Sequence, residues 1–132
     1  MNNRIKLSET DCQYLINEEE KTVSCKMFYR LKMDNETVGV FTYFFDEYPF
    51  NKYPCSLQNV TATARLSEGD TFDVKKGMQV ARAKAETKAY KRMRQIMKKL
   101  SGKLASMIVV TNDFENRAED IIKHNDEYLK TF

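Results

Sequence analysis

The clearest periodic pattern in the chain lies in residues 22–33, "TVSCKMFYRLKM", where apolar and polar side chains alternate. A period of two predicts a β-strand with one buried face and one wet face. Phe28 is an apolar residue among the bases of the wet face. The predicted buried positions are Val23, Cys25, Met27, Tyr29, Leu31 and Met33.

Two further strands follow from the same reasoning. Residues 34–37, "DNET", have turn chemistry, and residues 38–45, "VGVFTYFF", begin an apolar run, so a hairpin is predicted there. After a loop that carries both prolines, residues 59–66, "NVTATARL", predict the next strand. Strands joined by hairpins imply an antiparallel sheet that helices cover on one side.

Helix signals flank these strands. Residues 8–20, "SETDCQYLINEEE", begin with a Ser and an Asp three positions on, which predicts a short N-terminal helix. A long helix is predicted from about residue 72 to Leu100, with Asp70 or Asp73 as its cap.

Ser101–Gly102 is a stop signal for that helix. A capping box at Asn112 and Glu115 predicts a last helix, and residues 103–111 stay unassigned. The fold class is therefore α+β in the order α-β-β-β-α. A three-stranded antiparallel sheet is packed by a long basic helix, a C-terminal helix follows, and residues 1–132 form a single domain.

Residues 72–100 form an amphipathic pattern when they are placed on a helix of 3.6 residues per turn. One arc is apolar and should lie on the sheet, with three alanines that allow a close approach: Met78, Ala81, Ala85, Ala89, Met93, Ile96 and Leu100. The opposite arc is basic and consists of Lys84, Lys88, Lys91, Arg94 and Lys98.

Charge makes this basic arc informative. The whole chain carries a formal charge of +3, yet residues 75–103 hold 11 bases and one acid, Glu86. Lysines four apart on a helix repel each other, so an external anion would offset that cost. Nucleic-acid phosphate fits, an acidic protein surface is an alternative, and solvation by water alone explains many basic helices. The predicted nucleic-acid-binding residues are Lys75, Lys76, Lys84, Lys88, Lys91, Arg94 and Lys98.

Arg82 is a separate case because it falls within the apolar arc, four residues before Glu86. One interpretation is a structural salt bridge between the two at the edge of the core. The other is that Arg82 reaches past the core to bind phosphate or a partner.

Residues 43–54, "YFFDEYPFNKYP", are rich in aromatic side chains. Exposed rings would stack nucleic-acid bases, whereas buried rings would only pack the loop against the core. The acids Asp46 and Glu47 also make the segment suitable for a protein interface. The predicted partner contacts here are Tyr48, Phe50 and Tyr53.

Signatures of catalysis are missing from the sequence. His124 is the sole histidine, there is no Cys/His spacing of a zinc site, and no Gly-rich phosphate loop occurs. We therefore expect neither an enzyme nor a metal or other cofactor. Cys12, Cys25 and Cys55 are odd in number, which fits free thiols in a reduced cytoplasmic protein. No apolar run of membrane-spanning length and no signal peptide are visible, so no membrane partner is expected.

Residues 61–91 resemble a pattern in small phage and prophage proteins of unknown role, in which a strand leads to D-x-F-D, a glycine and a basic helix. The matching residues are Asp70, Phe72, Asp73, Gly77, Ala81, Arg82, Ala83 and Lys88. This resemblance implies a mobile-element origin.

Two other resemblances concern the basic helix. The element order is similar to that of double-stranded RNA-binding domains, whose second helix begins with paired lysines, here Lys75 and Lys76. The family's Gly-rich approach is absent, and Met78 and Gln79 replace its usual Ala-Lys. Residues 81–94, "ARAKAETKAYKRMR", are similar to the basic helix of single-strand annealing proteins, which lies on a sheet and tracks a DNA backbone.

The leading hypothesis is a small non-enzymatic phage-type protein that binds nucleic acid through the basic helix face, largely without sequence specificity. The alternative is a protein-interaction factor, a host-protein inhibitor or adaptor, that uses the basic face and the aromatic loop. A third hypothesis is a homo-oligomer in which acidic terminal helices pair with the basic helix of another copy.

Overall fold

The computed structural model describes residues 4–39, 56–66, 71 and 73–132. The chain divides into two units, Met1–Ile96 and Met97–Phe132. The fold class is α+β, as predicted, with a three-stranded antiparallel sheet and a long helix.

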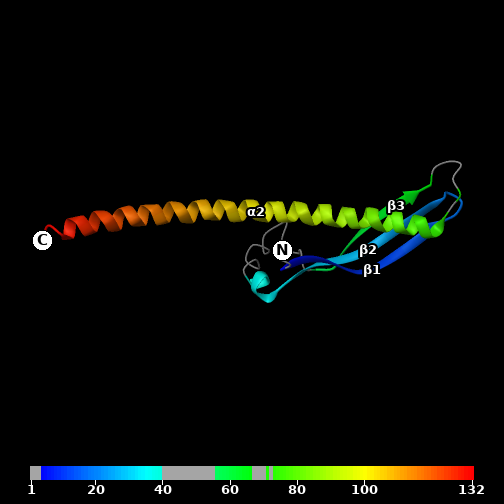
Figure 1. The fold of residues 1–132 in the computed structure, drawn as a ribbon, viewed down its shortest axis with the longest axis horizontal. Coiled ribbons are helices and arrows are strands. Elements are labelled where there is room, and N and C mark those ends of the chain that lie inside the picture. The colour runs from blue at the N-terminus through cyan, green and yellow to red at the C-terminus, as the bar shows by residue number, and fades with distance from the viewer. Residues whose placement is uncertain (1–3, 40–55, 67–70, 72) are drawn as a thin grey trace. The chain divides into compact units, whose positions relative to one another are not determined.

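The sheet of the first unit has the strand order β1-β2-β3 (Figure 1). Strand β1 covers Ile5–Asn17, β2 covers Thr22–Met33 and β3 covers Gln58–Arg65. The bounds of β2 are those that the alternation predicted. Five of its six predicted apolar positions are buried, and Met33 is half-buried.

The predicted N-terminal helix is wrong, because residues 8–17 belong to β1. Strand β1 pairs with β2 from Ile5 to Asn17, with a register shift between Glu9 and Asp11. A helix cap stabilises by about 1 kcal/mol. The summed stabilisation from the many cross-strand pairs of a long antiparallel pairing is larger. The acids Glu18–Glu20 lie in the turn between β1 and β2, where Lys21 adopts a φ of 52°.

The predicted hairpin after β2 is also wrong where the structure describes it. Residues 35–39 are helical, and Asp34 Oδ1 accepts a hydrogen bond from the Thr37 amide at 2.7 Å. The Asp and Asn that suggest a turn are also good residues at a helix start. The rest of that predicted strand, residues 40–45, lies outside the described residues. The sheet reaches three described strands through β1 instead.

Helix α2 covers Val74–Leu129. Asp73 is its cap, since Asp73 Oδ1 accepts from the Lys76 amide at 3.2 Å, while Asp70 lies outside the described residues. The predicted stop at Ser101–Gly102 and the separate C-terminal helix are wrong, because α2 continues through both and through residues 103–111. A single glycine costs a helix about 1 kcal/mol, and no proline follows to prevent continuation.

In the first unit, α2 lies along one face of the sheet (Figure 1). Ala81, Ala85 and Ala89 are fully buried, so the predicted apolar arc is confirmed. Gly77 marks the closest approach: a Cβ there would lie 2.7 Å from Val23 Cγ2. A small residue is therefore required at position 77.

The second unit consists of the later part of α2 and the last three residues of the chain. Most of its apolar side chains are exposed, from Met107 to Phe132. Within the described residues, no helix is long and apolar enough to cross a membrane.

Candidate functional site

Among the described strands, β3 is at an edge of the sheet. The backbone N–H and C=O groups of its successive residues point alternately toward β2 and away from it. The Leu66 amide donates to the Lys21 carbonyl at 3.1 Å, which fixes the phase of the alternation between β3 and β2. Even-numbered residues of β3 therefore bond to β2, and the N–H and C=O groups of Asn59, Thr61 and Thr63 point outward. We call this row the outer edge of β3.

Three basic side chains of α2 donate hydrogen bonds to the carbonyls of the outer edge of β3. Lys84 Nζ donates to Thr63 O at 3.3 Å, and Lys88 Nζ donates to Thr61 O at 2.8 Å. Arg92 Nη1 donates to Asn59 O at 3.1 Å and to the Tyr29 hydroxyl at 3.1 Å. Lys84 and Lys88 thus lie on the flank of α2 beside β3, and their predicted placement on the opposite arc is wrong.

This arrangement changes what the outer edge of β3 can bind. An ordinary edge strand presents donors and acceptors in alternation. Here three successive outward carbonyls already accept from cationic donors, so, within the part of the chain that the structure describes, the groups left for a ligand are mainly the outward N–H groups and the positive charges. The edge has become a row of donors that favours anions.

A groove of about 590 Å³ lies between α2 and β3 beside these bonds. Its lining combines three ammonium groups with two hydroxyls and a short apolar floor: Ala62, Thr63, Val80, Ala83, Lys84, Thr87, Lys88 and Lys91. The groove is shallow and follows the helix, which suits an extended ligand better than a compact one.

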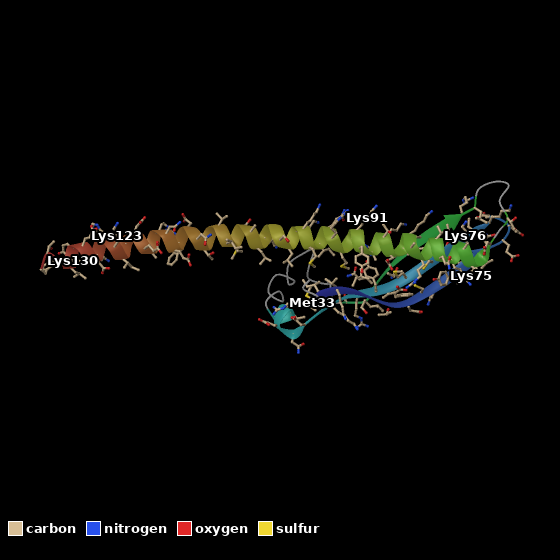
Figure 2. The ribbon with its side chains drawn as sticks, in the orientation of Figure 1. Met33, Lys75, Lys76, Lys91, Lys123 and Lys130 are labelled. Atoms are coloured by element: carbon tan, nitrogen blue, oxygen red, sulfur yellow. The ribbon has the colours of Figure 1, made fainter. Side chains whose placement is uncertain are left out.

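The positive charge along α2 is largely unneutralised. In the part of the chain that the structure describes, Lys75, Lys76, Lys91 and Arg94 take part in no ion pair, and all four are exposed. Lys75 and Lys76 lie at the start of α2, and Lys91 projects from the side of the helix away from the sheet (Figure 2). Lys98, also exposed, belongs to the second unit.

A second basic surface covers the face of the sheet that is turned away from α2. Its bases are exposed and come from all three strands: Lys6, Lys26, Arg30, Lys32 and Arg65. Lys26 Nζ lies 5.4 Å from the centre of the Phe28 ring, a cation–π contact. None of these bases was predicted as a site residue, although the alternation of residues 22–33 already places three of them on one face.

Arg82 forms a salt bridge, but its partner is Glu9 of β1 and not Glu86. Arg82 Nη2 lies 2.7 Å from Glu9 Oε2, and Nε donates to Oε1 at 3.2 Å. The hydrogen bonds from Arg82 hold the pKa of Glu9 below its ordinary value, and the same contacts raise the pKa of Arg82. The interpretation as a structural salt bridge at the edge of the core is the one that fits this geometry.

Cys12 completes this cluster, because its Sγ donates to Glu9 Oε1 at 2.8 Å. Burial, and then the hydrogen bond to Glu9, raise the pKa of Cys12 to about 12. The thiol therefore keeps its proton at neutral pH, unlike a nucleophilic cysteine. Cys12 and Cys25 are both free thiols, and Cys55 lies outside the described residues.

The aromatic contacts predicted at Tyr48, Phe50 and Tyr53 lie outside the described residues. In the ranges that the structure covers, no group of three or more His, Cys, Asp or Glu side chains could hold a metal ion.

Comparison of the chain with family models, curated proteins and solved structures finds no match. The resemblances to phage proteins, double-stranded RNA-binding domains and annealing proteins therefore stay predictions. The geometry of the outer edge of β3 and its surroundings is what indicates a function.

Proposed function

We propose that this protein is a non-enzymatic nucleic-acid-binding protein that holds the phosphate backbone along the outer edge of β3 and the adjoining flank of α2. The observation that carries the proposal is the capping of three outward carbonyls by Lys84, Lys88 and Arg92. These bonds use one lone pair of each carbonyl, and they hold three positive charges in a row beside the edge. A row of donors with fixed cations matches a row of phosphates.

The same geometry disfavours a protein strand as the ligand of this edge. A peptide that extends a sheet needs both N–H and C=O partners from the edge strand. At Asn59, Thr61 and Thr63 the carbonyls already accept from charged donors, so a peptide amide would have to share each oxygen with a lysine or an arginine. Phosphate oxygens only accept hydrogen bonds, and they can use the outward N–H groups without displacing anything.

The cations beside the groove are flexible side chains, and they give the proposed contact little sequence specificity. Lys84, Lys88 and Lys91 act as point charges on phosphate, and a shallow groove does not enclose a base. Binding would release counterions, so affinity should fall steeply as salt rises. The exposed Arg65 and Lys26 on the other face of the sheet extend the positive field around the same edge.

Fluorescence-anisotropy titration against labelled single- and double-stranded DNA and RNA, at two salt concentrations, tests the proposal. Micromolar or tighter binding with a steep salt slope is the expected result, and the four probes identify the polymer. No binding at low salt would overturn the proposal. The basic face would then serve an acidic protein partner or only water, and a pull-down from host lysate would follow.

A matched pair of double variants places the contact. Lys88→Gln with Lys91→Gln removes two charges beside the groove, while the glutamine amide at 88 keeps a donor for the Thr61 carbonyl. The slope of the logarithm of the binding constant against the logarithm of the salt concentration should fall in magnitude by about 1 for each phosphate that the variant no longer neutralises. Lys123→Gln with Lys130→Gln removes the same charge from exposed positions of the second unit and should leave the slope unchanged. Equal losses in both variants would mean general attraction rather than a site.

A further inference from the structure

The second unit carries an apolar stripe that its own residues do not cover. Phe114, Ile121, Ile122 and Leu129 are 63%, 60%, 59% and 63% exposed, although they lie on one side of α2. The acids and bases of this segment, among them Asp113, Glu119, Asp120, Lys123 and Glu127, lie mainly on the other side. A helix with one exposed apolar side and one charged side is typical of a helix that pairs with another helix.

The stripe repeats every seven residues over three heptads. Large side chains occupy one position of the repeat: Met107, Phe114, Ile121 and Tyr128. Smaller side chains occupy the position four residues after each of the first three: Thr111, Ala118 and Asn125. Alternating steps of four and three residues are the spacing of a coiled-coil seam, and here that spacing holds over three heptads, with Thr111 and Asn125 as polar members.

The alternation of large and smaller residues indicates how two such stripes fit together. If two copies run parallel and in register, large residues meet large ones and smaller residues meet smaller ones, layer after layer. If one copy is reversed, each large residue meets a smaller one; Phe114 then faces the partner's Ala118, and Met107 faces the partner's Asn125. Layers that pair large with small fill space evenly, so the stripe is complementary to its own reversed copy.

The flanks of the stripe support the same orientation. Ile108, Ile122 and Leu129 follow Met107, Ile121 and Tyr128 by one residue and widen the apolar surface on one side, whereas Glu115 follows Phe114 and interrupts that flank. In a parallel pair this flank would lie against Lys103, Arg117 and His124 of the other helix. In an antiparallel pair the two apolar flanks meet, and Ile108 lies beside the partner's Ile122. The reversed orientation therefore keeps Ile108 and Ile122 of the two copies in apolar contact, and it also brings the two Glu115 side chains close together at the centre of the pair.

We infer that residues 107–128 bind a second copy of this chain as an antiparallel helical pair. The pairing does not depend on nucleic-acid binding, because none of its residues belongs to the groove or to the outer edge of β3. It also differs from the homo-oligomer predicted from the sequence, in which acidic helices pair with the basic helix. The contact inferred here is apolar.

Sedimentation of the full chain over a range of concentrations tests the pairing. The unmodified protein should be a dimer at micromolar concentration. Phe114→Glu with Ile121→Glu puts two carboxylates into the seam and should raise the dissociation constant by about 100-fold or more. Val109→Glu is the matched control, since Val109 is 68% exposed and lies on the side of the helix away from the stripe. A monomeric unmodified protein, or equal loss in both variants, would overturn the inference.

A photo-crosslinker decides the orientation without using the native cysteines. p-Benzoylphenylalanine at position 107 should cross-link to the partner near Asn125, which mass spectrometry of the cross-linked peptides would locate. Cross-links near Met107 of the partner would mean a parallel pair and would overturn the antiparallel arrangement.

Discussion

The two parts of α2 have the same apolar periodicity but very different residues at the apolar positions. In the first unit the buried positions of the apolar arc begin with the small residues Gly77, Ala81, Ala85 and Ala89 and end with Met93 and Ile96. In the second unit the corresponding positions carry residues such as Met107 and Phe114, and they are exposed. Small residues are needed where a sheet lies directly against a helix, whereas large ones are used where side chains must reach a neighbouring helix. The size of the apolar residues therefore distinguishes the first turns of α2, from Gly77 to Ala89, from the second unit, although both have helical spacing.

The charged residues of the two parts differ in a parallel way. In the first unit, Lys84, Lys88 and Arg92 use their donors on a neighbouring strand. In the second unit, Arg117 pairs with Asp113 on its own helix at 3.3 Å. Charges of the first unit are thus positioned by tertiary structure, and those of the second by the helix itself. Three pairs of variants, each with one member in either part, test this difference.

The largest effect is expected from enlarging a buried alanine. Ala85→Leu forces three extra carbons into the contact between α2 and the sheet, where Ala85 is fully buried. The free energy of unfolding should fall by about 3 kcal/mol, because an overpacked core has to move its backbone. Ala105→Leu, at an exposed position of the second unit, should change it by less than about 0.5 kcal/mol. Urea denaturation followed by the near-ultraviolet circular dichroism of the tyrosines measures both. Similar losses would mean that the two parts of α2 are equally packed.

Glycine-to-alanine substitutions should have opposite signs in the two parts. Gly77→Ala places a methyl group 2.7 Å from Val23 Cγ2, and Val23 is fully buried. The resulting strain should exceed the gain in helix propensity and destabilise the first unit by about 1–2 kcal/mol. Gly102 has nothing within 4 Å of its missing Cβ, so Gly102→Ala should stabilise the helix by up to about 1 kcal/mol. Amide hydrogen exchange, measured on peptides of each part, would report the two signs separately. A stabilising Gly77→Ala would contradict the close approach of α2 to β2.

The smallest effect concerns the salt bridge between Arg82 and Glu9. Arg82→Gln should lower the free energy of unfolding at pH 7 by about 1 kcal/mol, since the Arg82 side chain is 51% exposed and that of Glu9 is 25% exposed. The pKa of Glu9 is lowered in the folded protein, so its contribution is present above about pH 4.5 and is lost as the pH falls through the folded-state pKa. The difference between the two proteins should therefore close in acid.

Arg117→Gln is the control for that measurement. Its pair with Asp113 is exposed on both sides and lies within one helix, so the variant should unfold like the unmodified protein at every pH. Urea denaturation from pH 3 to pH 7 gives both curves. A gap for Arg82→Gln that persists below the folded-state pKa of Glu9 would mean that Arg82 contributes by packing rather than by charge.

Several elements could be predicted from the amino-acid sequence alone: β2, β3, the start of α2 near residue 72 and the apolar arc of the first part of the helix, whereas the choice between Asp70 and Asp73 as the cap stayed open. Each of these depends on a period of two or of 3.6, or on a cap within a few residues, so the information is local. The fold class followed from them, while the described strand β1 was not among the predicted strands.

Other features depend on contacts between segments that are distant in the sequence. Residues 8–17 could satisfy a helix cap or a strand pairing, and pairing with β2 selected the strand. A helix could either end at Ser101–Gly102 or continue through these residues. The glycine destabilises the helix by about 1 kcal/mol, which is too little to end α2 there.

The candidate site shows the same limit. Composition and spacing identified the bases of α2, but they could not show that Lys84, Lys88 and Arg92 would reach the carbonyls of β3. The lysine and arginine side chains are long, and the atoms they bind are backbone atoms of a strand some 21 to 33 residues away. Which backbone atoms face outward depends on the register between β2 and β3. That register is a property of the folded sheet and not of either segment alone.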